Sequence, residues 1–254
     1  MRELHGQVAV VTGAASGIGL GIATAFANEG MRVVMADVDA ARLEREVATL
    51  GPGRVAGVIC DVADAAAVER LAEETVRRFG KVHVICNNAG IIRSGRTWEI
   101  SLPDWNAVLS VNLLGVVHGI HTFVPLLLES GSEGHVVNIA SMASVLPVQG
   151  IAPYNVAKHG VLALSETLRM DLEDIGAPIG VSVVMPGRVP SRLGRGPDDP
   201  YEPPSDPVEP DLLPAAEVGR LVVDAVRTDR MYVFTHPERV ADVESRFARI
   251  TAPR

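Results

Sequence analysis

The chain has 254 residues, 47% of them apolar and 21% charged, and a net charge of −8. That length fits one α/β domain with a single well-filled core, and the composition is that of an ordinary soluble globular protein. No cluster of Lys and Arg interrupts the acidic balance, which argues against a nucleic-acid partner.

Short β-branched runs alternate with longer helical patterns along the chain. Continuous apolar runs of this kind suit strands that are buried on both faces of a parallel sheet. We therefore expect one α/β, Rossmann-like doubly wound domain over residues 1–254, with a seven-stranded parallel sheet and helices on both faces. The expected strands are Gln7–Thr12, Arg32–Asp37, Val55–Asp61, Val82–Asn87, His135–Ala140, Gly180–Met185 and Tyr232–Thr235. The expected helices lie near Ile18–Asn28, Ala40–Leu50, Ala65–Phe79, Leu102–Leu128, Ala152–Ile175 and Ala215–Arg227.

One segment, Arg188–Leu213, breaks this alternation because it contains seven prolines. Prolines at that density exclude a regular helix or a central strand. The segment follows the sixth strand at the carboxyl edge of the sheet, where doubly wound folds bind their ligands. We interpret residues 188–213 as a lid that covers the substrate; the alternative is an excursion that contacts no ligand.

A glycine-rich stretch, Thr12–Gly19, joins the first strand to the first helix. Its glycines, at positions 13, 17 and 19, allow a tight turn, a close approach of the backbone to a pyrophosphate and close helix packing. The spacing differs from the usual dinucleotide fingerprint but serves the same purpose. The stretch therefore predicts a dinucleotide site.

Three residues at tight spacing, Ser141, Tyr154 and Lys158, predict acid–base chemistry. A phenol with a pKa near ~10 is a poor base at neutral pH. If Tyr154 and Lys158 share a helix, they lie on one face, and the ammonium would bring the tyrosine pKa toward the working range. The Ser141 hydroxyl could hydrogen-bond the carbonyl oxygen that the phenol protonates. A chance Tyr-x-x-x-Lys on a surface helix is the alternative, and the glycine loop argues against it.

The chain resembles the short-chain dehydrogenase/reductase family, from about Gly6 to the final strand. The motifs that carry the resemblance stand in the family's order: Thr12–Gly19, Asp61-Val62, Asn87-Asn88-Ala89-Gly90, Asn112, Ser141, Tyr154-x-x-x-Lys158 and Pro186-Gly187. The resemblance implies an oxidoreductase that transfers hydride between NAD(H) and a secondary alcohol or ketone.

The resemblance also implies roles for individual residues. The expected catalytic residues are Asn112, Ser141, Tyr154 and Lys158, with a water on the main chain near Asn112 and the nicotinamide ribose on Lys158. Asp61 would hold the adenine amino group, Val189 would lie near the carboxamide, and Ser191 stands where the family commonly has Thr. The expected cofactor-binding residues are Gly13, Ser16, Gly17, Ile18, Gly19, Asp37, Asp61, Val62, Asn88, Ala89, Gly90, Tyr154, Lys158, Pro186, Gly187, Val189 and Ser191. Asn87 is expected to be structural.

Asp37 closes the second strand, where a carboxylate can accept hydrogen bonds from the adenosine ribose and repel a 2′-phosphate. The positions at which related NADP-dependent enzymes often carry a basic residue are Ala15, Ser16 and Val38 here, and none is basic. NAD(H) is therefore favoured over NADP(H). The alternative role for Asp37 is a helix N-cap, which Asp39 is better placed to fill.

We expect a largely apolar substrate wall, suited to a lipophilic alcohol such as a sterol, a terpenoid or a hydroxylated ring. The expected substrate residues are Ser141, Met142, Gln149, Tyr154 and Arg188, and Ile91, Arg93, Val148 and Met185 should also border the substrate. Two other functions stay open. One is an NADPH-dependent ketoreductase in a biosynthetic pathway; the other is a non-catalytic nucleotide-sensing protein, which the presence of both Tyr and Lys disfavours.

His118 and His121 could be drawn as metal ligands, but no Cys, Asp or Glu completes a set, so we expect no metal site. Gly115 and Gly119 on the same helix indicate close helix approach, which in the family usually occurs between subunits. A homo-oligomer, dimer or tetramer, is therefore expected.

The apolar stretch Val108–Leu128 comes nearest to a membrane span, yet its Asn, His and Pro residues favour a buried helix. No targeting segment is visible at the N-terminus. Cys60 and Cys86 lie in apolar runs and are expected to be buried free thiols in a reducing compartment. We expect a cytoplasmic protein without a membrane partner.

Overall fold

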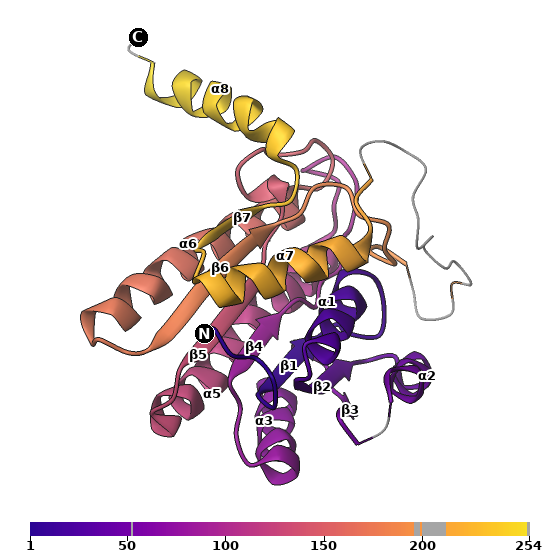
Figure 1. Ribbon diagram of the computed structural model, residues 1–254. Helices are drawn as coiled ribbons and strands as arrows, with labels where there is room; N and C mark the ends of the chain where they lie inside the picture. The colour runs from indigo at the N-terminus through magenta and orange to yellow at the C-terminus, as the bar shows by residue number, and fades with distance from the viewer. Residues whose placement is uncertain (52, 196–198, 200–211, 253–254) are drawn as a thin grey trace.

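The computed structural model describes residues 1–51, 53–195, 199 and 212–252 and contains a seven-stranded parallel sheet, as the sequence predicts (Figure 1). The strand order is β3-β2-β1-β4-β5-β6-β7. The strands are β1 (Val8–Thr12), β2 (Arg32–Asp37), β3 (Val55–Ile59), β4 (Val84–Asn87), β5 (Gly134–Ile139), β6 (Ile179–Met185) and β7 (Tyr232–Phe234). The order reverses between β1 and β4, and this reversal places a ligand crevice at their carboxyl ends.

Helices cover both faces of the sheet. The helices α1, α2 and α7 pack on one face, and α3, α5 and α6 pack on the other. Their bounds are α1 (Gly17–Asn28), α2 (Ala40–Leu50), α3 (Ala65–Phe79), α4 (Leu102–Leu109), α5 (Gly115–Ser130), α6 (Ala152–Asp174), α7 (Ala215–Thr228) and α8 (Val240–Thr251). Short helical turns are η1 (Ser110–Leu114), η2 (Met142–Ser144) and η3 (Pro237–Arg239). The doubly wound fold is therefore confirmed.

The long helix expected over Leu102–Leu128 is divided. It consists of α4, the π-helical turn η1 and α5, and it continues to Ser130. By length and composition the whole stretch could cross a membrane, the one such stretch in the described part of the chain. Its inner side packs into the core through Val116, Phe123 and Leu127.

Gly115 and Gly119 on α5 both face the core of their own chain. A Cβ on Gly115 would lie 2.7 Å from the side chain of Val62, and one on Gly119 would lie 2.0 Å from Asn87 Oδ1. Asn87 in turn donates to Asn138 at 2.9 Å in the buried interior. These glycines therefore serve the packing of α5 within the chain, and the homo-oligomer stays a prediction.

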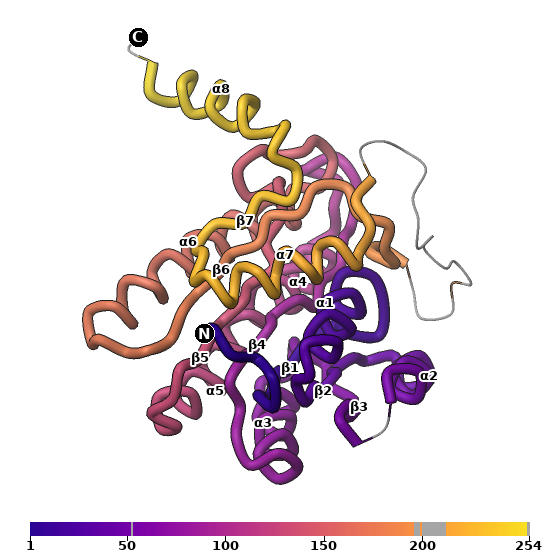
Figure 2. The backbone as a smooth tube through the Cα atoms, in the orientation of Figure 1, coloured from indigo at the N-terminus to yellow at the C-terminus, as the bar shows by residue number. Residues whose placement is uncertain are grey.

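The C-terminal helix α8 was not predicted from the sequence. None of its residues is buried, and Figures 1 and 2 show it extending away from the sheet beyond β7. Arg246 links it to the body by donating to the Val145 carbonyl at 3.1 Å. Its apolar residues Val240, Val243, Phe247 and Ile250 do recur at helical spacing, and Val243 packs against the core, so the sequence did carry a signal for this helix.

Candidate active site

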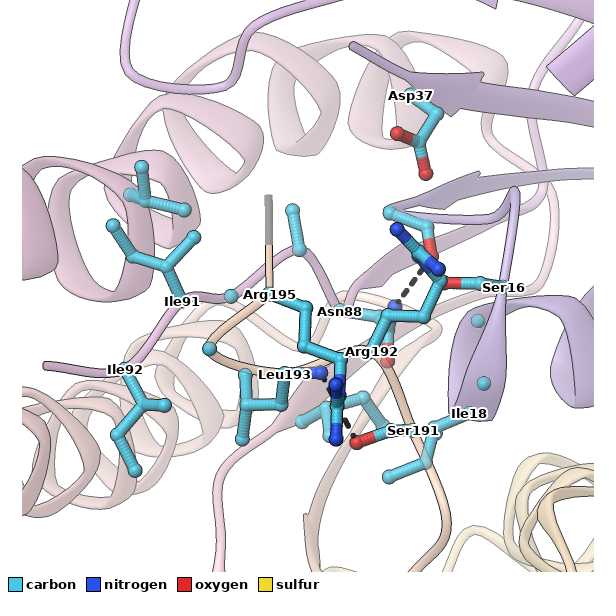
Figure 3. Close-up of a pocket in the computed structure, with 18 of the residues that line it drawn as sticks. Ser16, Ile18, Asp37, Asn88, Ile91, Ile92, Ser191, Arg192, Leu193 and Arg195 are labelled. Atoms are coloured by element: carbon cyan, nitrogen blue, oxygen red, sulfur yellow. Dashed lines mark hydrogen bonds between the residues drawn. The ribbon is translucent and has the colours of Figure 1, made fainter. Parts of the chain in front are cut away.

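A cavity of about 1140 Å³ opens at the carboxyl ends of the strands, and all the residues expected to bind the cofactor line it. The cavity is lined by residues at the carboxyl ends of β1 to β6 and by residues of α1 and α6. A pocket of this size can hold a large ligand, since ordinary small-molecule sites have volumes of about 300–1,000 Å³. The segments that the sequence predicted to act together therefore meet at one site, part of which is shown in Figure 3.

The glycine loop fits a pyrophosphate because its glycines carry no side chains that would keep a ligand away from the backbone. Gly13 and Gly17 have φ values of +62° and +52°, a region that favours glycine. A Cβ on Gly19 would lie 2.1 Å from the carbonyl oxygen of Gly13. Ser16 begins α1 but makes no side-chain capping bond, so the amino end of the helix keeps backbone donors for an anion.

Asp37 lies at the end of β2 and faces this cavity. Its carboxylate accepts hydrogen bonds from the backbone N–H of Ala15 at 2.9 Å and of Asp39 at 3.1 Å. Asp39, and not Asp37, caps α2, since its side chain accepts from Arg42 N at 3.0 Å. A carboxylate has about four acceptor positions, so Asp37 retains capacity for ribose hydroxyls. The sequence reasoning missed Arg42, which lines the same cavity and pairs with Asp39.

Asp61 and Val62 follow β3 and form another part of the wall. The Asp61 side chain accepts from Ala63 N at 2.9 Å, so it also holds its own turn. The Val62 carbonyl lies 2.8 Å from Nδ1 of His118 on α5. His118 therefore serves to fix the backbone of this wall.

Tyr154 and Lys158 lie one turn apart on α6, and both are buried. The Lys158 ammonium donates to the Ile139 carbonyl at 2.7 Å and lies 5.6 Å from the centre of the Tyr154 ring. Ser141 begins η2, just after β5; its hydroxyl donates to the Pro186 carbonyl at 3.4 Å, and its side chain hydrogen-bonds Tyr154. The three expected catalytic side chains thus converge.

Burial dominates the acid–base properties of this group. It raises the pKa of Tyr154, and the hydrogen bond from Ser141 opposes that rise. It also lowers the pKa of Lys158 to about 8. The proposed effect of Lys158 on the Tyr154 pKa stays a prediction, since burial and the Ser141 hydrogen bond account for the direction seen here. The chain's other lysine, Lys81, is exposed and precedes β4 at the opposite edge of the sheet.

Asn112 lies in the π-helical turn η1 and is fully buried. Its side chain accepts from the N–H of Ile91 and donates to the carbonyl of the same residue, both at 2.8 Å. This pair of bonds fixes the backbone that carries Gly90 and Ile91 along the cavity. Asn112 does not line the cavity itself, so the structure gives its side chain a positioning role.

A second cavity, of about 230 Å³, adjoins the first on the other side of Ser141 and Tyr154. Of the expected substrate residues, Met142, Val148 and Arg188 line it, and Ile91 and Arg93 line the larger cavity. Sequence reasoning missed a polar contribution from the chain after β7, namely His236, Glu238 and Arg239.

Two expected substrate residues lie elsewhere. Gln149 is exposed and lies outside both cavities. It stands on a turn in which the Asn155 side chain makes two hydrogen bonds to the backbone of Val148. Met185 is 1% exposed and packs in the core beneath the site. The side chain of a strand residue points to one face only, and the register of β6 turns Met185 inward.

Comparison with known proteins identifies the relatives of this chain. Residues 7–199 match the family described as short chain dehydrogenase. The chain is 38% identical to 1-deoxy-11-beta-hydroxypentalenate dehydrogenase of Streptomyces avermitilis, over 96% of this chain and 88% of that protein. It is also 38% identical to D-threitol dehydrogenase of Mycolicibacterium smegmatis, over 76% of this chain and 74% of the relative. A short chain dehydrogenase/reductase from Burkholderia phymatum in complex with NAD has a TM-score of 0.91 and 36% identity, covering 100% and 99% of the two chains.

Proposed function

The chain belongs to the short-chain dehydrogenase family, and on that premise we propose that it interconverts a lipophilic secondary alcohol and its ketone with NAD(H), using Tyr154 as acid and base. One observation carries the proposal. Ser141, Tyr154, Pro186 and Gly187 line both cavities, so the catalytic group lies where a cofactor space and a substrate space meet. The bound nicotinamide supplies the hydride acceptor or donor.

In oxidation, the Tyr154 phenolate takes the proton of the substrate hydroxyl. The Ser141 hydroxyl, already bonded to that phenol, orients the substrate oxygen. Because burial raises the Tyr154 pKa, the phenolate needs cationic support in the complete site, and the Lys158 ammonium lies 5.6 Å from the centre of the ring. Lys158 also donates toward the cofactor ribose in this proposal. In the reverse direction the phenol returns its proton to the ketone oxygen.

Asp37 supports NAD(H) as the cofactor. Its carboxylate is held by two backbone donors at the end of the cavity next to Ala15, so a 2′-phosphate brought beside it would meet a fixed negative charge. The neighbouring Val38 is 62% exposed and offers no positive charge there. The relative from Burkholderia phymatum that binds NAD supports the same choice.

The smaller cavity supports a compact, largely apolar substrate. Its walls include Met142, Leu146, Val148 and Ile151, which suit a hydroxylated ring better than a polyol. The name of the Streptomyces relative, a hydroxypentalenate dehydrogenase, favours the same class, whereas that of the D-threitol dehydrogenase favours a polyol. Measuring NADH formation with matched cyclic alcohols and linear polyols separates the two, and a preference for polyols would contradict the proposal.

Residues 188–213 remain proposed as a lid, although 196–198 and 200–211 lie outside the described residues. The base of this segment is closed by the bond from Leu213 N to the Arg188 carbonyl at 3.0 Å. We also retain a homo-oligomer and a cytoplasmic location as proposals. Exposed apolar side chains on neighbouring elements, Leu114 and Val156, support the first, and the two buried free cysteines favour the second.

Tyr154→Phe tests the mechanism, since it removes the phenol hydroxyl and keeps the ring. We expect kcat to fall by roughly 10²-fold or more, with NADH affinity little changed. Tyr232→Phe is the matched control, because Tyr232 is half-exposed and bonds only to Glu166 at 2.8 Å in the described structure. Tyr154→Phe retaining more than about half of the wild-type activity would show that another group moves the proton.

A further inference from the structure

The residues that follow Pro186-Gly187 cross the mouth of the large cavity. A Cβ on Gly17 would lie 3.1 Å from the Cβ of Ser191, and one on Gly194 would lie 2.7 Å from Cγ2 of Ile92. Residues 190–195, here called the strap, therefore contact the glycine turn at one end and the opposite wall at the other. The strap forms part of the cavity lining.

Two arginines on the strap, Arg192 and Arg195, line the cavity, and sequence reasoning assigned no role to either. In Figure 3 the side chain of Arg192 runs toward Ser16, and that of Arg195 runs back toward Ser191. Arg192 is partly buried. Arg195 is exposed and pairs with Asp199 at 3.1 Å, which offsets part of its charge.

Positive charge thus gathers over the glycine turn from two independent elements. The amino end of α1 contributes the partial positive charge of its backbone N–H groups, which Ser16 does not cap. The strap contributes a guanidinium from Arg192, whose planar fork of donors matches the oxygens of a phosphate. A doubly negative group of pyrophosphate type is the ligand that this combination would recognise.

We propose that Arg192 binds the pyrophosphate of the cofactor and thereby couples the strap to cofactor binding. This inference rests on the proposed dinucleotide cofactor. The same guanidinium could instead meet a 2′-phosphate on the adenosine ribose, but the fixed Asp37 carboxylate lies at that end of the cavity. The strap then binds the cofactor through the Arg192 guanidinium, in addition to forming part of the cavity wall.

Ligand binding to Arg192→Gln, followed by protein fluorescence and calorimetry without any substrate, tests this assignment. The ligands are NADH, ADP-ribose, adenosine and adenosine 2′-phosphate. We expect the variant to bind NADH and ADP-ribose roughly tenfold more weakly, the effect of losing one charge-assisted hydrogen bond, and adenosine equally well. Arg192→Lys should recover part of the affinity, since it keeps the charge without the fork. Arg220→Gln, on the exposed face of α7, is the matched control.

Each other outcome would overturn the assignment. Unchanged NADH affinity in Arg192→Gln would show that the guanidinium makes no contact with the cofactor. An equal loss for adenosine would indicate a structural role, and a loss confined to adenosine 2′-phosphate would place the arginine at the ribose. Because NADH binding by the wild type is measured in the same series, a failure of Arg192 is distinguishable from a failure of the proposed cofactor.

Discussion

Replacing Lys158 with methionine should separate the cost of burying this amine from its proposed role in catalysis. Lys158 is 3% exposed, and burial lowers its pKa from 10.5 to about 8. Between about pH 8 and 10.5 the unfolded chain binds more protons at this residue than the folded protein does. The contribution of Lys158 to the unfolding free energy therefore rises with pH through that window. Below pH 8 the full cost of burying its ammonium is present.

The structure sets the size of the effect. A pKa lowered from 10.5 to about 8 corresponds to a cost of about 3 kcal/mol at neutral pH, of which about 2 kcal/mol is relieved between pH 7 and pH 9.5. Methionine does not titrate, so this rise is absent in Lys158→Met. The variant also leaves the Ile139 carbonyl without its donor, which changes stability at every pH and cancels from the pH-dependent difference.

Urea unfolding of the ligand-free protein at pH 7, 8.5 and 9.5 measures this difference. The unfolding free energy of the wild type, minus that of Lys158→Met, should grow by about 2 kcal/mol across the range. Lys81→Met removes an exposed lysine, so its unfolding free energy should show the same pH dependence as that of the wild type. If plots of unfolding free energy against pH are parallel for the wild type and Lys158→Met, the reasoning is refuted, because burial then imposes no cost on the ammonium. Lys158→Met should lack activity throughout.

Three further predictions concern the cofactor, the core and the thiols. Asp37→Ser combined with Val38→Arg should shift kcat/KM toward NADP⁺, because a repulsive charge is removed and an attractive one added; equal use of both cofactors by the wild type would contradict the role of Asp37. Gly119→Ala should lower the unfolding free energy by about 1–3 kcal/mol in urea titrations, since its Cβ meets buried Asn87. Both cysteines are buried with raised pKa values, so a thiol reagent at pH 8 should label them only after denaturant is added.

The sheet and the convergence of the proposed catalytic residues were predictable because local patterns encode them. Apolar runs marked all seven strands, and the spacing of Tyr154 and Lys158 encoded their shared face of α6. What the sequence could not show is which distant segments meet. The chain after β7 places His236 against Gly187, with His236 Nδ1 3.2 Å from Gly187 N, yet the two stand 49 residues apart. Arg192 was overlooked for a similar reason, since only the fold brings the strap onto the glycine turn.

The choice of arginine for nearly every basic position has a practical consequence for attaching this enzyme to a solid support. Lys158 is enclosed, whereas Lys81 is exposed just before β4, at the amino edge of the parallel sheet. Of the two lysine side chains, only that of Lys81 is therefore accessible for coupling to an amine-reactive resin. Since the cavities open at the carboxyl edge, a molecule tethered through Lys81 would present them to the solution, and immobilisation would orient the catalyst without any engineered tag.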